Sequence, residues 1–185
     1  MKSILAIAIL VVCSAISAHA SDGIYVAYEP TLSGQEFHHS VNALAVEGDG
    51  DLGAFAWCQA DENHVRGIVG PVMLRRNAQM GAGVGLENST NPLLVAAFMR
   101  VDGGNFTGYG VLRVGGTDLI NVRYRLGYYL NRDLTLGFAL EAYKGMGPSL
   151  EFRSGAWDIA VSSLYQPGFQ SGQSTQSVSL RYKAF

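Results

Sequence analysis

Residues 118–153 alternate between apolar and polar side chains with a period of two, and this alternation constrains the fold more than any other feature of the sequence. From residue 121 to residue 130, every second side chain is apolar or aromatic, whereas the intervening positions include Arg123 and Arg125. After a short polar turn the same alternation resumes, with Glu141 on the polar face. Because successive side chains of a β-strand point to opposite faces, the pattern predicts two antiparallel strands.

A pair of strands with this pattern fits two kinds of sheet. In a soluble sheet the charged face contacts water, whereas in a transmembrane barrel the apolar face contacts lipid and the charges line the lumen. All 23 glycines lie after the first twenty residues. They make up about 14% of residues 21–185, against a usual ~7%. Glycine suits tightly curved strands and a lumen that needs space, so the composition favours the barrel.

The first twenty residues have the features of an export signal. Lys2 supplies a positive start, residues 4–12 form an unbroken apolar stretch, and Ala18 and Ala20 form a small-x-small cleavage site. We therefore expect cleavage after Ala20, leaving one domain, residues 21–185. No later stretch is long and apolar enough for a membrane helix.

Charge and cysteine content narrow the class of protein further. Removing Lys2 leaves twelve of the thirteen basic residues against fifteen acidic ones, a net charge of −3 that argues against a nucleic-acid partner. Ten of these twelve are arginine, which keeps its charge and forms bidentate pairs in a low dielectric. Only Cys58 follows the cleavage site, so no intramolecular disulfide is expected.

Segments of strand character recur along the whole domain, separated by turn-forming residues, and no helical period competes with them. We predict an all-β fold, a closed antiparallel transmembrane β-barrel of about twelve strands. Ten strands would result if 148–165 formed one bent strand, and eight if some N-terminal segments were loops. Connections after even-numbered segments are shorter, and outer-membrane barrels have their short turns on the periplasmic side. We therefore expect both termini, which lie at the same end as these connections, to be in the periplasm. The predicted segments are 23–29, 36–46, 52–60, 66–75, 79–88, 93–101, 106–115, 119–130, 133–143, 148–154, 156–165 and 174–185.

The alternation assigns eight basic and five acidic residues to the inward face, an excess of +3. An Arg or Lys side chain that faces lipid at mid-bilayer destabilises a barrel by roughly 2–4 kcal/mol, so we expect these charges to face the lumen. The predicted inward charges are Glu29, Arg75, Glu87, Arg100, Arg113, Arg123, Arg125, Glu141, Glu151, Arg153, Asp158, Arg181 and Lys183. The predicted outward residues include Val84, Leu86, Val95, Met99, Leu112, Val114, Leu136, Phe138, Leu150, Phe152, Trp157 and Ile159.

Nine of the inward charges are the candidate lumen and selectivity residues. They form either a positive constriction that favours anionic solutes or a closed plug of Arg–Glu pairs that fills a small barrel. Arg123 and Arg125 share a face of one strand near Glu141, which cannot neutralise both, so one of them is free to reach a solute or Glu151. The nine candidates are Arg75, Glu87, Arg100, Arg113, Arg123, Arg125, Glu141, Glu151 and Arg153.

The export signal, the alternating strands, the glycine excess and a final segment ending in Phe185 together resemble the small Gram-negative outer-membrane β-barrel proteins. The resemblance implies an outer-membrane location, contact with membrane lipids and lipopolysaccharide, and recognition by the barrel-insertion machinery. That class usually has apolar residues third and fifth from the end, where this chain has Lys183 and Arg181. Either a bulge restores the phase or the terminal Phe is coincidental. Twelve strands with an Arg-rich lumen also resemble narrow channels for acidic oligosaccharides.

Other chemistry has weaker support in the sequence. His38, Ser40 and Asn42 fall on one strand face, which allows a His-activated Ser nucleophile as in outer-membrane lipid hydrolases, although no acid is fixed by spacing. His38, His39 and His64 with nearby acids match no known metal site. The glycines of 81–85 repeat within a strand pattern and do not form a phosphate loop.

We therefore predict a narrow channel for small, preferentially anionic solutes, without enzymatic activity, cofactor or metal. The alternatives are a non-conducting structural or surface-interaction barrel, a lipid-modifying hydrolase using His38 and Ser40, and a soluble secreted β-sandwich.

Overall fold

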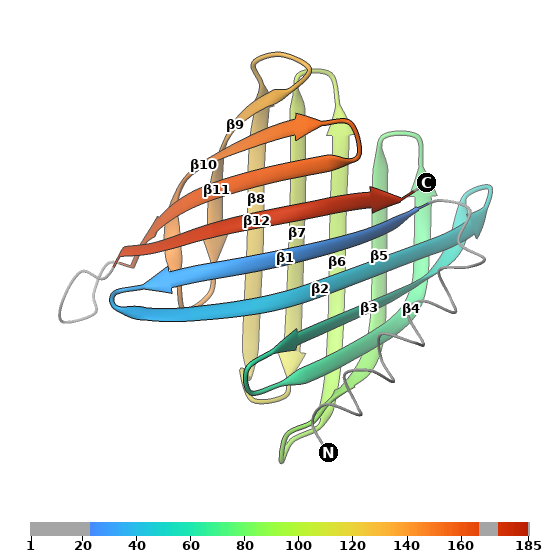
Figure 1. Ribbon diagram of the computed structural model, residues 1–185. Coiled ribbons are helices and arrows are strands. Elements are labelled where there is room, and N and C mark those ends of the chain that lie inside the picture. Colours follow the sequence, from blue (N-terminus) through green and yellow to red (C-terminus); the bar gives the residue numbers. More distant parts are fainter. Residues whose placement is uncertain (1–22, 167–173, 185) are drawn as a thin grey trace.

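The computed structural model describes residues 23–166 and 174–184, which form one closed barrel of twelve antiparallel strands (Figure 1). Each strand pairs with its neighbours in sequence, and β1 closes the barrel by pairing with β12. Closure leaves no unpaired strand edge. The strands are β1 (Ile24–Ser33), β2 (Glu36–Asp49), β3 (Leu52–Asp61), β4 (Val65–Arg75), β5 (Ala78–Glu87), β6 (Leu93–Gly103), β7 (Phe106–Gly115), β8 (Ile120–Tyr129), β9 (Leu134–Glu141), β10 (Gly145–Ser154), β11 (Trp157–Tyr165) and β12 (Ser174–Ala184).

The structure confirms the closed antiparallel barrel with twelve strands and excludes the ten- and eight-strand alternatives. β10 and β11 are separate strands that pair on both sides of a turn at Gly155, whose φ of 59° suits glycine. β1 is longer than predicted because Pro30 remains in the ladder with β2, opposite His39. On the other side the β1–β12 ladder skips Glu29 and Pro30, and Pro30 has no N–H to donate.

The connections alternate in length along the chain. Those after even-numbered strands contain two residues, except for four between β8 and β9, whereas most of those after odd-numbered strands are longer. The exception is the two-residue turn between β1 and β2. We call the end of the barrel with the even-numbered connections the turn end and the opposite end the loop end. β1 begins and β12 ends at the turn end.

The last strand keeps its alternation without a bulge in the described residues. Its pairing with β11 is continuous from Ser174 to Tyr182. Leu180 and Tyr182 are exposed on the outer face, whereas Arg181 and Lys183 line the interior. The charges near the C-terminus are therefore lumenal. Phe185 and the predicted export signal, residues 1–20, lie outside the described residues.

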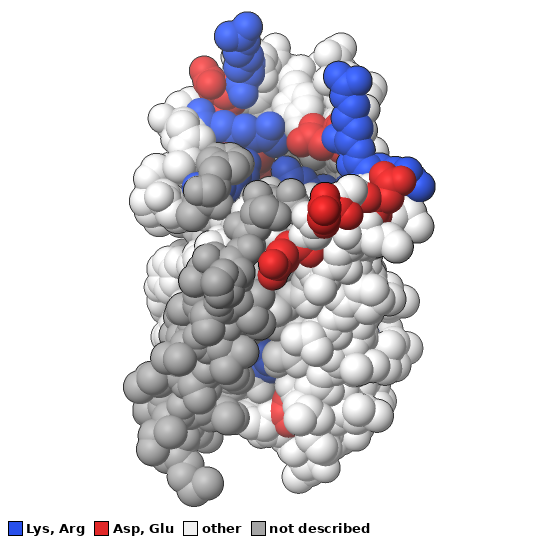
Figure 2. All heavy atoms as spheres, turned by 90° about the vertical axis from the view of Figure 1, so that its right-hand side faces the viewer, with Lys and Arg blue, Asp and Glu red and all other residues white. Residues whose placement is uncertain are grey.

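The outer surface of the barrel is apolar. All twelve predicted outward residues are exposed, with relative accessibilities from 43% to 63%. Figure 2 shows charged side chains gathered at one end of the visible face, with few on most of the wall. Conversely, polar residues such as Asp158, Ser162 and Ser177 are buried. This inversion of a soluble protein's pattern fits a wall that contacts lipid.

Helices play no part in the described structure. Among those residues no helix is long and apolar enough to cross a bilayer.

The interior has two different walls. The inward faces of β2–β6 carry a buried apolar cluster, and we call this cluster the apolar wall. The inward faces of β7–β12 and β1 carry most of the lumenal charges, and we call them the ionic wall. Phe55 and Phe98 pack edge to face with ring centroids 4.9 Å apart. A side chain at Gly81 would overlap the Phe98 ring, so the glycines of β5 make room for these aromatics. The apolar wall consists of Val46, Phe55, Ile68, Val72, Leu94 and Ala96, with Leu44, Trp57, Leu74 and Phe98 packed against them.

Candidate lumenal site

The barrel encloses a cavity of about 520 Å³ that follows its length. Its lining includes His38, Glu62 and Lys144 at the loop end, and Gln79 and Lys183 at the turn end. One continuous space therefore connects residues near both ends of the barrel.

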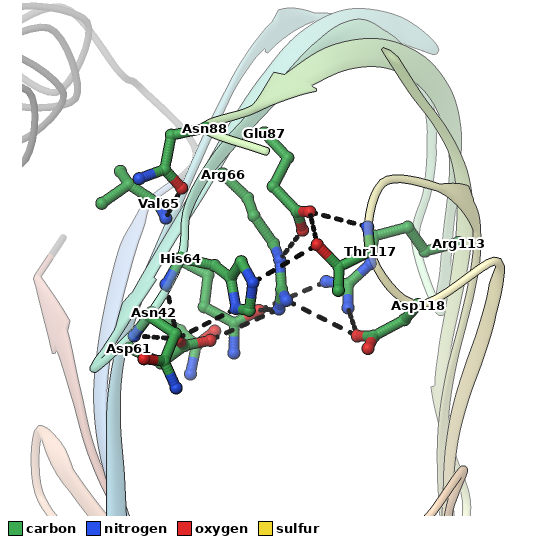
Figure 3. Close-up of polar contacts among 12 residues, drawn as sticks. Asn42, Asp61, His64, Val65, Arg66, Glu87, Asn88, Arg113, Thr117 and Asp118 are labelled. Carbon is green, nitrogen blue, oxygen red and sulfur yellow. Dashed lines mark hydrogen bonds and ion pairs between the residues drawn. The ribbon is translucent and has the colours of Figure 1, made fainter. Parts of the chain in front are cut away.

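At the loop end, a network of charges ties the β7–β8 connection to β4 and β5 (Figure 3). Arg66 donates from Nε to Glu87, and its Nη2 lies 3.5 Å from Asp118. Arg113 donates to the same Asp118 oxygen at 3.3 Å. Thr117 donates to Glu87 from its backbone nitrogen at 2.7 Å and from its hydroxyl at 2.6 Å. These charge-assisted bonds hold the connection against the strands at this mouth.

Between the loop end and the middle of the lumen, Arg123 of β8 reaches across to β1. It donates to Glu29 at 2.8 Å and to Glu141 at 3.3 Å. Lys144 adds a second cation to Glu141 at 3.0 Å. Asn42 also donates to Glu29, at 3.1 Å. The two carboxylates are therefore fully engaged by neighbours on several strands.

Toward the turn end, two further acids are neutralised by basic neighbours. Glu151 accepts from Arg153 at 2.9 Å and from Arg181 at 2.6 Å. Lys183 pairs with Asp158 at 2.7 Å. These contacts brace the ionic wall between β10, β11 and β12.

Arg125 is the exception on this wall. It lines the cavity, and it forms no hydrogen bond or ion pair with any described residue. Its register partners are Tyr109 and Ala139, which offer no charge. The two acids whose charges act on it are already engaged, Glu29 by Arg123, and Glu141 by Arg123 and Lys144. Arg125 thus presents an uncompensated guanidinium to the lumen.

Two further contacts cross the lumen and set its width. The guanidinium carbon of Arg113 lies 5.7 Å from the ring centroid of Trp57 on β3. That of Arg100 lies 5.4 Å from the ring of Tyr25 on β1. Cation–π contacts of this length place opposite walls within reach of one side chain, so the passage is narrow.

The structure brings eight of the nine candidate residues into the barrel interior. Seven line the cavity: Arg100, Arg113, Arg123, Arg125, Glu141, Glu151 and Arg153. Glu87 is buried beside it, with a side chain only 1% exposed.

The prediction that Arg75 faces the lumen is wrong. Arg75 lies at the end of β4 on the outward face shared with Met73, 57% exposed and paired with Asp51. The lumenal arginine of this strand is Arg66, which the prediction missed. The two are an odd number of residues apart, so a continuous strand must put them on opposite faces. That parity was available in the sequence, but β4 is apolar on both faces, and alternation alone did not identify the inner one.

The charge of the lumen is also smaller than predicted. The cavity lining contains nine basic and seven acidic side chains, and Glu87 is buried beside it, so the excess is +1 instead of +3. Asp118 and Arg66 were both absent from the predicted set. Asp118 lies in a connection, where strand periodicity carries no information.

The possible catalytic and metal residues do not assemble into a site. His38 lies 3.5 Å from both Glu36 and Glu62. Among the described residues no hydrogen bond joins His38 to Ser40. Nor do three His, Cys, Asp or Glu side chains of the described part come together as metal ligands.

A closed twelve-stranded barrel with an apolar exterior and a charged lumen is the architecture of outer-membrane porins, and the chain has that fold. It is similar to the KdgM porin, with a TM-score of 0.55 and 16% sequence identity over 87% of this chain and 99% of that one. The NanC porin gives a TM-score of 0.53 at 11% identity, over 86% of this chain and 100% of the other.

The outer membrane protein Omp33 of Acinetobacter baumannii gives a TM-score of 0.52 at 10% identity, covering 88% of this chain and 98% of that one. No protein-family model matches the sequence, and no curated protein matches it. At these identities the likeness establishes the fold.

Proposed function

We propose that this protein is an outer-membrane channel for small solutes, with a preference for anions. The observation that carries the proposal is the continuous lumenal cavity with the unpaired Arg125 on its wall. A guanidinium that no protein carboxylate neutralises is available to a passing anion. Charged residues that line a pore set its selectivity.

The distribution of charge along the lumen supports the anion preference. From the loop end down to Arg123, the cavity lining carries four basic and five acidic side chains. From Arg125 to the turn end, it carries five basic and two acidic ones. An anion that passes the neutralised mouth therefore enters a region of positive potential. The five basic residues are Arg100, Arg125, Arg153, Arg181 and Lys183.

The proposal does not include an enzymatic role. The fold is that of porins, and His38 contacts glutamates rather than Ser40. The proposal does include outer-membrane lipids and lipopolysaccharide as the surroundings of the apolar exterior. It also includes delivery to the membrane by an export signal and the barrel-insertion machinery.

Conductance of the purified, folded protein in planar bilayers tests the proposal. We expect discrete channels and, in a KCl gradient, a reversal potential that indicates chloride preference. Arg125→Gln should shift the reversal potential toward cations because it removes the uncompensated charge. Arg75→Gln is the matched control, since it removes an arginine outside the lumen, and it should change neither quantity. Unaltered selectivity in Arg125→Gln would refute the role of this residue.

A non-conducting structural or surface-interaction barrel is the second candidate. The contacts that cross the lumen favour it, because Arg113 with Trp57 and Arg123 with Glu29 narrow the passage. Absence of current from protein that shows heat-modifiable gel mobility would establish this candidate and reject the channel.

A further inference from the structure

The apolar wall presents an aromatic and aliphatic surface to the lumen. Leu44, Trp57 and Phe98 are only partly buried against the apolar cluster, and all three also line the cavity. A channel for small inorganic ions gains nothing from such a lining, because ions lose water contacts beside apolar side chains. The apolar lining therefore favours a solute that has apolar surface of its own.

Arg125 lies on the opposite side of the lumen from Leu44 and Trp57, whereas Phe98 is two strands away from it. In the closed strand order, β8 is six strands away from β2, which carries Leu44. The contact of Arg113 with Trp57 links the neighbouring strands β7 and β3 across the same space. The lumen therefore has one apolar side and one cationic side.

The two sides require different properties in one solute. The apolar side gains free energy when it covers a ring or hydrocarbon surface, since that removes apolar area from water. The cationic side binds a carboxylate through charge-assisted hydrogen bonds from the guanidinium. An inorganic anion uses only the cationic side, and a polyhydroxylated acid has less apolar surface to lay on Trp57 and Phe98 than a plain ring has.

We propose that the solutes of this channel are amphipathic organic anions, small monocarboxylates with an aromatic or alicyclic ring. The ring lies on Leu44, Trp57 and Phe98, and the carboxylate is held by Arg125. This inference rests on the proposed channel function and specifies its solute class.

The test compares benzoate and cyclohexanecarboxylate with galacturonate, which has the same charge and a hydroxylated ring. Each is measured as the permeability relative to chloride from bi-ionic reversal potentials, and as block of the chloride current. Electrical detection at neutral pH is essential because protonated benzoic acid crosses lipid unaided. We expect the two apolar acids to exceed galacturonate by about tenfold in permeability or in potency of block.

Variants at Leu44 assign the preference to the apolar surface. Leu44→Asn should lower the benzoate-to-galacturonate ratio by about threefold, whereas Leu44→Met, which keeps an apolar side chain of similar size, should preserve the ratio. Because the solute ranking is measured on the wild-type protein, it remains decisive even if Leu44→Asn does not fold.

The outcomes separate the two proposals. Absence of chloride current rejects the channel and this inference with it. With chloride current present, equal ratios, a preference for galacturonate, or no effect of either apolar acid reject the solute class alone.

Discussion

The apolar and ionic walls of the lumen arise from the same strand alternation but are stabilised differently. On the apolar wall, Phe55, Phe98 and their neighbours pack against one another, and glycines on β5 provide the space. On the ionic wall, every lumen-lining cation among the described residues except Arg125 has a carboxylate partner. Alternation therefore decides which side chains face inward, and their chemistry decides whether they fill the interior or line a passage.

This difference explains why the lumen is narrower than a ring of twelve strands would suggest. The apolar wall excludes water by packing, so it occupies part of the cross-section. The ionic wall keeps its polar groups beside the remaining space. The two walls face each other across the cavity, and Trp57 of one contacts Arg113 of the other.

The largest expected effect concerns the buried charges at the loop end. Arg66→Met should destabilise the barrel by about 3–5 kcal/mol, because it leaves Glu87 buried without its guanidinium. Urea-induced unfolding in lipid vesicles measures the change. The control, Arg75→Met, breaks an exposed pair with Asp51 and should cost less than about 1 kcal/mol. Equal costs would show that the network at this mouth is not coupled to stability.

The next effect concerns the outer surface of the barrel, which is apolar behind both walls. Val161→Arg, on the outer face of β11 near its middle, should cost about 2–4 kcal/mol in a lipid bilayer. Tyr165→Arg, on the same face at the end of the strand, should cost no more than about 1 kcal/mol. Unfolding in vesicles provides both values. If neither substitution were costly, the outer surface would be in water and the barrel soluble.

The smallest effect concerns packing in the apolar wall. Gly81→Ala should cost about 1–3 kcal/mol, since the added methyl group overlaps the Phe98 ring. In a Phe98→Leu background the same change should cost less, which a double-mutant cycle detects as coupling. Gly67→Ala is the matched control, because its methyl group would have no atom within 4 Å and should be nearly neutral or stabilising. Additive costs for Gly81 and Phe98 would contradict the packing described for this wall.

Much of the architecture could be predicted because strand alternation is a local property. The inward positions of Arg123 and Glu141 and the outward positions of Leu136 and Phe138 follow from residue parity within a strand. The same argument failed for Arg75, which we predicted to face the lumen. Because β4 is apolar on both faces, its charged residue suggested the wrong face as the inner one. Parity also could not show that Asp118, in a connection, would be shared by two arginines.

The sequence by itself determined that this chain forms β-strands with apolar side chains on one face and charges on the other, because alternation depends only on neighbours along the chain. It predicted about twelve strands but left ten and eight open, and the closed ladder of the structure decided the number. Only the tertiary structure decided that Arg123 binds Glu29, that Arg125 is left without a carboxylate, and that half of the interior is packed with aromatic and aliphatic groups. These contacts join residues far apart in the sequence. They depend on the closure of β1 onto β12 and on the register of every strand between them.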